Sequence, residues 1–333
     1  MEKKGMNNIL RRMIALVAAG GIAIVGVAAQ TEAVDTMAAA ESWALVKVPV
    51  ACMRSAKGHS SELASQVVMG TPVKLKQNDG DWWLAITPEG YEGWIIDNSL
   101  AHKSAEEMNR WRDAGRWVVT SLDEAYIEQW PGAGCPRCRV SGAVNGSIVE
   151  GVAIPGMEYI KVLLPDGREG YISASAVTPV EEWAGQPFDP VRILDLAYSM
   201  EGSPYLWGGT STKSADCSGL SRIAYYNNGI IIRRDADQQA KTGRRIEPSD
   251  TASLRSGDLL FFGNPETRRV THVAIYDKDG MYVHSSGRVK RNSIDPNNSH
   301  YLTTPYLWAV NISDCVGSDG ITQAAQHPWY FNR

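Results

Sequence analysis

Two stretches of the chain repeat one short pattern of hydrophobic and polar positions. Over 82–95 and again over 159–172, a β-rich apolar run is followed by a Pro-acid-Gly turn and a second apolar run. Turn residues between two such runs predict a β-hairpin. Short apolar runs with frequent turns precede each copy, so we expect two small β-barrels, at 42–101 and 117–178. The upstream strands expected are Val46–Val50, Val73–Lys76, Val118–Thr120 and Ser147–Val152.

Connecting segments follow each expected barrel. In the connector after the first barrel, 102–116, Ser104 precedes two glutamates. This pattern predicts a capped and charged helix over 104–114. The second connector contains several prolines and ends near Pro190.

From Val191 onward the apolar positions change to helical spacing. A helix is expected over 191–200, ending before Gly202, and a second helix begins at Cys217 and continues to Tyr226. Strand-like runs come after the helices. Helices followed by antiparallel strands are typical of an α+β domain, here 190–315, which leaves 316–333 as a C-terminal tail. The strands expected are Asp258–Phe262, Val270–Tyr276, Met281–His284 and Tyr306–Ile312.

The N-terminus has the features of an export signal. Basic residues precede an apolar run, 13–27, which ends in small residues, so 1–29 is expected to be a signal peptide. Gly20 and Gly21 interrupt the run, and it is shorter than the ~20 apolar residues of a spanning helix. An uncleaved membrane anchor is the alternative. We therefore expect an exported protein, located in the periplasm, at the cell envelope or outside the cell.

The charge balance argues against a nucleic-acid partner. The chain has 33 Lys and Arg against 37 Asp and Glu, a net charge of −4, without a basic run. The sequence shows no nucleotide motif or metal motif, so no cofactor is expected.

The cysteines are few and odd in number. An exported protein with five cysteines has at least one thiol that is free or paired with another chain. Cys135 and Cys138 form a C-x-x-C pair, but no second pair completes a zinc site. A local disulfide or two idle thiols is the preferred interpretation.

One cysteine lies where a helix is about to begin. Cys217 follows Asp216, a helix-capping residue, and precedes Ser218 and Gly219. A thiol at a helix N-terminus lies near unpaired N–H groups and the positive end of the dipole, which favour the nucleophilic thiolate. The same N–H groups can stabilise an oxyanion. A buried structural cysteine is the alternative.

Two of the six histidines lie on adjoining expected strands and are candidates for the base and its orienting partner. If residues 277–279 form a three-residue loop, Tyr276 faces Gly280. His272 then lies directly opposite His284 on one face of the sheet. A two-residue loop would place them on opposite faces, because side chains alternate along a strand. Two half-buried histidines without a catalytic role are the alternative.

The motifs together resemble a known family. PYLWGG-x6-DCSGL, LRSGDLLFF, THVAIY and His284 occur in this order over 192–315 and resemble the NlpC/P60 cysteine peptidases of bacterial cell-wall turnover. The repeated barrels resemble bacterial SH3 domains. The resemblance implies an α+β fold with a papain-like catalytic domain preceded by two small SH3-like barrels. Two barrels before such a domain resemble the γ-D-glutamyl-L-diamino acid endopeptidases, also called dipeptidyl-peptidase VI.

The resemblance implies specific roles. Cys217 would be the nucleophile, His272 the general base and His284 the residue that orients it. The first barrel would hold a free amine with an acid and a tyrosine, and an Arg-acid pair would lie near D-Glu. Many relatives have Pro-Arg where this chain has Arg233-Arg234. The substrate-binding residues implied are Glu62, Tyr91, Tyr205, Trp207, Asp216, Ser218, Arg234 and Asp235.

Physical arguments support these roles independently. A free ammonium in a closed pocket needs a carboxylate, and a substrate carboxylate needs an arginine or similar donor. Plain packing of Tyr205 and Trp207, and a solvated Glu62, are the alternatives.

The implied reaction is hydrolysis of the bond between γ-D-Glu and the diamino acid of peptidoglycan stem peptides that begin with a free L-Ala. The product would be L-Ala-γ-D-Glu, and the enzyme is expected to act as a monomer without metal. The diamino acid, lysine or diaminopimelate, stays open. One alternative is an endopeptidase or amidase acting on glycan-attached stems, with the barrels as wall anchors. Another is a non-catalytic wall-binding protein.

Overall fold

The computed structural model describes residues 42–332. The expected signal peptide, 1–29, lies outside the described residues. Within 42–332, no helix has the length and apolar character needed to cross a membrane.

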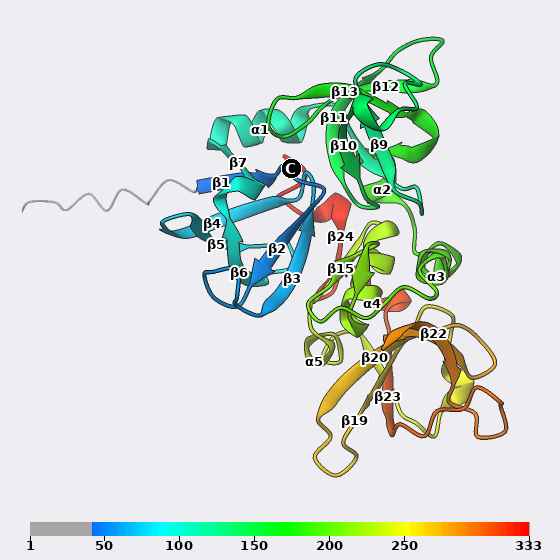
Figure 1. Ribbon diagram of the computed structural model, residues 1–333. Helices are drawn as coiled ribbons and strands as arrows, with labels where there is room; N and C mark the ends of the chain where they lie inside the picture. The colour runs from blue at the N-terminus through cyan, green and yellow to red at the C-terminus, as the bar shows by residue number, and fades with distance from the viewer. Residues whose placement is uncertain (1–41, 333) are drawn as a thin grey trace, which may run out of the picture. The chain divides into compact units, whose positions relative to one another are not determined.

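Residues 42–103, here called the first β-domain, form an antiparallel sheet of seven strands, shown in blue and cyan in Figure 1. The strand order is β3-β2-β6-β5-β4-β1-β7, and apolar side chains such as Val46, Val73 and Ile95 form its core. The strands are β1 Ser42–Val46, β2 Val50–Arg54, β3 Leu63–Val68, β4 Pro72–Asp79, β5 Trp82–Ile86, β6 Glu92–Ile96 and β7 Leu100–Lys103.

Residues 116–179, the second β-domain, repeat this topology. Their strand order is β10-β9-β13-β12-β11-β8-β14, which becomes the order of the first sheet when seven is subtracted from each number. The duplication expected from the sequence therefore appears as a duplicated sheet. The strands are β8 Arg116–Val119, β9 Ala125–Glu128, β10 Arg139–Ala143, β11 Ile148–Ala153, β12 Tyr159–Leu163, β13 Glu169–Ser173 and β14 Val177–Pro179.

A glycine repeated in both hairpins has the same structural cause. Gly93 faces Ala85 across the first hairpin, and Gly170 faces Val162 across the second. A Cβ atom on Gly93 would lie 2.4 Å from the Met53 side chain, and one on Gly170 would lie 2.6 Å from a neighbouring isoleucine. Neither sheet has room for a side chain there, so close packing accounts for both glycines.

One expected strand is wrong. The sequence predicts a strand over Val46–Val50, but β1 ends at Val46 and β2 begins at Val50. Pro49 has no N–H to donate to a sheet, which suits the turn between the two strands.

The helix between the β-domains is confirmed. Helix α1 spans Ala105–Asp113 and begins with a capping box, in which Ser104 Oγ accepts the Glu107 N–H at 3.1 Å. Glu107 Oε2 accepts the Ser104 N–H at 2.7 Å in return. A further short helix, α2, spans Val180–Gly185 within the expected connector.

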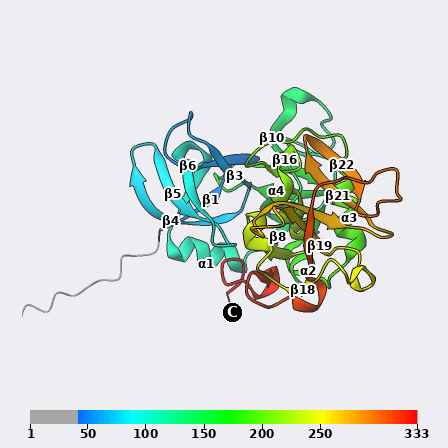
Figure 2. The ribbon, with the colours of Figure 1, turned by 90° about the horizontal axis from the view of Figure 1, so that it is seen from below.

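The C-terminal domain, 190–332, packs its helices against an antiparallel sheet. Helix α4, Cys217–Asn227, lies against one face of this sheet, as Figure 1 and Figure 2 show. Leu220 of α4 shares a buried cluster with Phe261, Val273 and Val283 of the sheet. The sheet order is β18-β23-β19-β20-β21-β22. Its elements are α3 Pro190–Ser199, α5 Ala236–Gln239, β18 Arg244–Ile246, β19 Leu259–Gly263, β20 Val270–Tyr276, β21 Met281–Ser286, β22 Arg288–Ser293 and β23 Tyr306–Asn311, with small strands β15 Thr210–Ser211 and β16 Ser214–Ala215.

The segment expected as a C-terminal tail, 316–333, packs on both the C-terminal domain and the first β-domain. Strand β24, Ile321–Gln323, pairs with β17, Ile230–Ile232, in the C-terminal domain. Trp329 packs edge-on against Trp43 of the first β-domain, with ring centroids 5.0 Å apart. Tyr330 is fully buried, and its hydroxyl lies 3.1 Å from the hydroxyl of Tyr226 on α4. The closing aromatics therefore tie the first β-domain to the C-terminal domain.

The cysteines follow the preferred interpretation. Cys135 and Cys138 form a disulfide, whereas Cys52, Cys217 and Cys315 are free thiols.

Because Tyr330 is fully buried between domains, Tyr330→Ala should lower the free energy of unfolding by about 3–5 kcal/mol. The matched variant Tyr330→Phe keeps the ring and loses the hydroxyl contact with Tyr226, so it should cost about 1 kcal/mol. Urea denaturation measures the free energy of unfolding of both variants. An equally small decrease in the two variants would contradict a packing role for the ring.

Candidate active site

Asp216 holds the start of helix α4 in place. As the N-cap residue, its Oδ1 accepts the Gly219 N–H at 2.7 Å, and its Oδ2 accepts the Gly208 N–H at 2.9 Å. A Cβ atom on Gly219 would lie 2.0 Å from the Gly209 carbonyl oxygen, so the first turn accepts only glycine there. The helix start expected from the sequence is confirmed, and it brings Cys217 to the helix tip.

Arg234 is bound mainly to this cap. It donates to both carboxylate oxygens of Asp216, at 3.2 and 2.7 Å, and to Ser218 Oγ at 2.9 Å. Its Nε donates to Ser65 Oγ on β3, at 3.0 Å. Four of the five guanidinium N–H groups are therefore engaged within the protein. The resemblance implied an arginine beside the substrate's D-Glu, but this geometry leaves one N–H for such a contact.

The thiol of Cys217 is neutral in the resting protein. The backbone N–H groups of Ser218 and Val273 face the sulfur and favour the thiolate. Burial and the carboxylate of Asp216 have the larger effect and raise the pKa of the Cys217 thiol to about 11. The thiolate favoured by the sequence argument is thus not the resting form. The helix terminus favours the thiolate, but the effect of burial is larger.

The two imidazoles are coupled. His272 Nε2 and His284 Nδ1 lie 2.7 Å apart, one on β20 and one on β21. Burial and the neighbouring His284 lower the pKa of His272 from 6.5 to about 3, and burial lowers that of His284 to about 4. Both rings are therefore neutral near neutral pH.

Their pairing differs from the expected register. The hairpin closes with the Asp277 N–H donating to the Met281 carbonyl, so the loop is 278–280 instead of 277–279. Ile275 faces Val283, and the two histidines are consequently diagonal neighbours on the same face instead of direct partners. Within this loop, Asp279 and Gly280 adopt positive φ angles of 52° and 78°.

Asn292 completes the row of polar groups and determines its tautomers. Its Nδ2 donates to the His300 carbonyl at 2.9 Å, which turns its Oδ1 toward His284 Nε2, at 2.9 Å. His284 must then carry its proton on Nε2 and accept from His272 at Nδ1. His272 therefore carries its proton on Nε2, which leaves Nδ1 as a free base.

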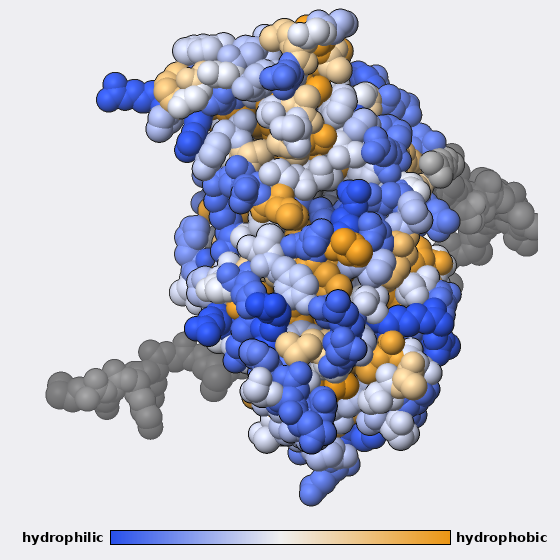
Figure 3. Space-filling model, turned by 90° about the vertical axis from the view of Figure 1, so that its right-hand side faces the viewer, coloured by the Kyte–Doolittle hydropathy of each residue, from blue (hydrophilic) through white to orange (hydrophobic). Residues whose placement is uncertain are grey.

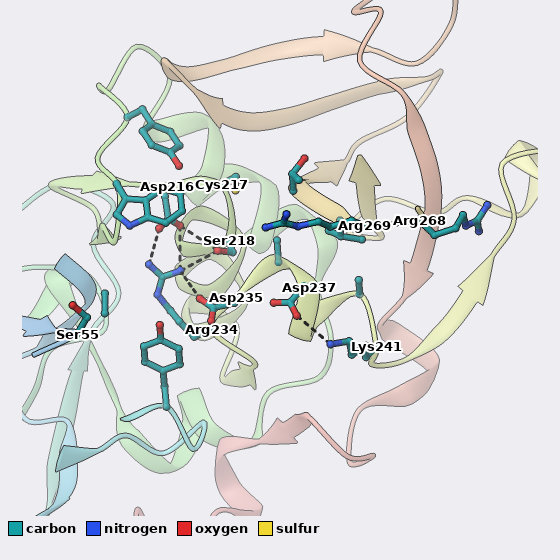
Figure 4. Close-up of a pocket in the computed structure, with 18 of the residues that line it drawn as sticks. Ser55, Asp216, Cys217, Ser218, Arg234, Asp235, Asp237, Lys241, Arg268 and Arg269 are labelled. Atoms are coloured by element: carbon teal, nitrogen blue, oxygen red, sulfur yellow. Dashed lines mark hydrogen bonds and ion pairs between the residues drawn. The ribbon is translucent and has the colours of Figure 1, made fainter. Parts of the chain in front are cut away.

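Cys217 opens onto a cleft of about 1140 Å³, shown in Figure 4. All eight predicted substrate-binding residues line this cleft together with the thiol. The first β-domain contributes two of them, so residues distant in sequence meet at one site. These eight residues are Glu62, Tyr91, Tyr205, Trp207, Asp216, Ser218, Arg234 and Asp235.

Two pairs of these residues contact each other across the cleft. Trp207 Nε1 donates to Glu62 Oε1 at 2.6 Å, and Tyr91 donates to the carboxylate of Asp235. The pKa of Tyr91 is raised by its burial and by the nearby Asp235.

Buried contacts hold the first β-domain against the C-terminal domain. Gln66 Oε1 on β3 accepts the Thr210 N–H at 2.9 Å and the Ser211 hydroxyl at 3.0 Å. Glu89, in the turn of the first hairpin, forms a buried ion pair of 2.8 Å with Arg222 on α4. The wall of the cleft that carries Glu62 and Tyr91 is therefore firmly positioned.

Several groups at the site were missed by sequence reasoning. Asn292 lies on β22, a strand that the hydrophobic pattern did not indicate because it is largely polar. The remaining ones come from helix α5 and the segment after it, from strands β18 and β23, and from the β19–β20 hairpin, all outside the recognised motifs. They are Asp237, Lys241, Arg245, Arg268, Arg269 and Trp308.

A thiol at a helix tip, packed on a sheet that carries linked imidazoles, is the arrangement typical of cysteine hydrolases. Comparison with known families agrees with this class. The NlpC/P60 family matches residues 202–311, and the bacterial SH3 domain family matches residues 50–101. Residues 202–311 thus form an NlpC/P60 domain, and residues 50–101 form a bacterial SH3 domain.

Relatives cover most of the chain. A Lysinibacillus sphaericus protein named "Dipeptidyl-peptidase 6" is 29% identical over 255 residues, which are 72% of this chain and 88% of the relative. A Bacillus cereus protein named "Gamma-D-glutamyl-L-lysine dipeptidyl-peptidase" is 27% identical over 263 residues, 75% of each chain. The crystal structure of an NlpC/P60 family protein from Bacillus cereus has a TM-score of 0.68 at 21% identity and covers 81% of this chain and 99% of that one. The similarity to this crystal structure supports the fold of the chain.

The neutral imidazoles make stability depend on pH. Because the folded pKa values of His272 and His284 lie below the ordinary 6.5, the unfolded chain binds more protons as the pH falls below 6.5. Stability is therefore lost from pH 6.5 downward. Between pH 7.5 and 5.0, the free energy of unfolding of His284→Gln should fall by about 1–2 kcal/mol less than that of the parent protein. Urea denaturation at each pH measures the difference. Parallel losses in both proteins would refute neutral, buried rings.

Proposed function

We propose that this protein is a cysteine peptidase that hydrolyses the γ-D-Glu–diamino acid bond of peptidoglycan stem peptides with a free N-terminal L-Ala. The product is L-Ala-γ-D-Glu. The observation that carries the proposal is the meeting of Cys217 with Glu62 and Tyr91 in one cleft, since the latter two come from the first β-domain. The names of the Lysinibacillus and Bacillus relatives agree with it.

In the first half-reaction, the sulfur of Cys217 attacks the γ-carbonyl carbon while its proton passes to His272 Nδ1. Backbone N–H groups at the tip of α4 stabilise the oxyanion. When the C–N bond breaks, the protonated imidazole gives this proton to the departing amine, and a thioester remains. A water molecule then gives a proton to His272 and attacks the thioester, which releases the dipeptide acid and restores the thiol.

His284 and Asn292 act as positioning residues in this mechanism. The bond from His284 Nε2–H to Asn292 Oδ1 leaves His284 Nδ1 free to accept from His272. This keeps the basic nitrogen of His272 at Nδ1. A positive charge that forms on His272 is shared along the same line of hydrogen bonds.

Glu62 recognises the free amine in this proposal. It has no cationic partner among the described residues, and Trp207 Nε1–H holds one of its oxygens at 2.6 Å. An ammonium entering the cleft finds a carboxylate already positioned for it. Tyr205 and Trp207 form aromatic walls. The remaining N–H of Arg234 is the donor proposed for the D-Glu carboxylate. Ser218 lies beside it, and its hydroxyl donates to Asp216 Oδ1 at 3.2 Å and accepts from Arg234.

The wider assignments are also proposals. The matching strand order supports a second SH3-like barrel in the second β-domain. We propose export through the N-terminal signal segment and a monomeric state. On the face shown in Figure 3, hydrophobic residues form small separate areas among hydrophilic ones, which supports the monomer.

The first test compares L-Ala-γ-D-Glu-L-Lys with its N-acetylated form. The free peptide should have a kcat/KM at least about tenfold higher, because acetylation removes the charge that Glu62 binds. Glu62→Gln should reduce this ratio, and Cys217→Ala should abolish turnover of both peptides. Equal cleavage of the two peptides would exclude amine recognition. Turnover by Cys217→Ala would exclude the mechanism, and release of fragments from intact sacculi would favour action on glycan-attached stems.

The positioning role of Asn292 is tested by two substitutions. Asn292→Ala removes the acceptor for His284 and should lower kcat about tenfold, equivalent to about 1.4 kcal/mol, with little change in KM. Asn292→Asp keeps an acceptor oxygen and should retain more activity. A purely structural role would instead lower the melting temperature in proportion to activity, and equal activity of all three proteins would remove Asn292 from the mechanism.

A further inference from the structure

The cleft has two ends of opposite charge. Glu62 and Asp235 lie at the end formed with the first β-domain. The other end contains four cationic side chains, from the segment after α5, from β18 and from the β19–β20 hairpin. In Figure 4, Cys217 and Ser218 lie between Ser55 on one side and the cationic end on the other. The cations are Lys241, Arg245, Arg268 and Arg269.

An aromatic platform orients two of these cations. Trp308 of β23 is only 7% exposed, and the guanidinium of Arg245 lies 4.2 Å from its ring centroid. The guanidinium of Arg268, from the neighbouring hairpin, lies 5.0 Å from the same ring. Stacking on a buried ring limits the freedom of an arginine side chain without using its N–H groups. The N–H groups of these two arginines that Glu247 does not bind remain available for hydrogen bonds.

The cationic end keeps an excess of positive charge. Glu247 pairs with Arg245 at 2.6 Å and with Arg268 at 3.9 Å. Lys241 pairs with Asp237 at 3.1 Å. Arg269 has no side-chain partner among residues 42–332, so two carboxylates face four cations. An anionic ligand group would find an unpaired donor there.

The direction of the substrate follows from the proposed function, on which this inference rests. If Glu62 holds the N-terminal amine, the peptide runs from the first β-domain to the bond beside Cys217. The fragment that departs then extends toward the cationic end. This fragment is the diamino acid, with or without further residues.

We infer that the cationic end is a subsite for carboxylates of the departing fragment. It selects a diamino acid whose side chain itself carries a carboxylate, of the diaminopimelate type, over lysine. A lysine side chain places only an ammonium near these cations, whereas a diaminopimelate side chain adds a carboxylate that they can bind. Arg269 is the residue with most effect on this choice, because no carboxylate of the described residues competes for it.

Binding to the inactive Cys217→Ala protein tests the subsite without hydrolysis. Calorimetry should show that L-Ala-γ-D-Glu-meso-diaminopimelate binds about fivefold more tightly than L-Ala-γ-D-Glu-L-Lys, the size of a solvent-accessible ion pair. Adding Arg269→Glu should abolish or reverse this preference, and 0.5 M NaCl should weaken it. The matched control is Arg137→Glu, an exposed arginine of the second β-domain that does not line the cleft; it should keep the preference. Equal affinity for the two peptides, or a preference unaffected by Arg269→Glu, overturns the subsite.

Hydrolysis by the protein with Cys217 intact separates this inference from the proposed function. If neither peptide is hydrolysed but the inactive variant prefers the acidic one through Arg269, the proposed function fails and the subsite stands. If both are hydrolysed with equal kcat/KM and bound equally, the subsite fails and the function stands. Failure of the inactive variant to bind either peptide contradicts both.

Discussion

The site depends on the hydrogen bonds and the ion pair made by the carboxylate of Asp216. It caps helix α4, accepts the Gly208 N–H from the preceding loop, and binds Arg234 through both oxygens. Arg234 in turn donates to Ser65 of the first β-domain. A buried charge pair is tolerated only when nearly all its hydrogen bonds are made, and here they join three parts of the chain. The helix tip, the loop before it and the wall of the cleft are therefore positioned together.

The same carboxylate affects the chemistry of its neighbour. Burial and, to a smaller extent, Asp216 raise the pKa of the Cys217 thiol, while burial lowers the pKa values of His272 and His284. Neutral thiol and neutral imidazole are then the resting forms. In the proposed mechanism, the sulfur is activated by proton transfer to His272, whose tautomer is already determined by its hydrogen bonds with His284 and Asn292. A resting protein of this kind exposes little thiolate to unwanted reactions.

The first β-domain contributes to the site by its placement as well as its residues. Its contacts with the C-terminal domain are the Glu89–Arg222 ion pair, the Gln66 hydrogen bonds and the packing of Trp43 against Trp329. These contacts come from a hairpin turn, a strand and the end of the chain, so no local signal predicts them. They turn an open groove beside Cys217 into a cleft with an acidic and a cationic end. A wall-anchoring domain alone would not require this close docking.

The sequence by itself determined what depends on neighbours along the chain. The capping box at Ser104, the cap at Asp216, the repeated hairpins and strand β20 all follow from local turn chemistry and periodicity. The resemblance to a known family indicated the eight residues that line the cleft. The tertiary structure alone decided the direction of the pKa shift of Cys217, the diagonal placement of His272 and His284, the partner of Arg234 and the contact of Asn292 with His284. Burial, strand register and charge pairing depend on contacts between residues that are distant in sequence. A one-residue shift of a loop is enough to change which side chains face each other.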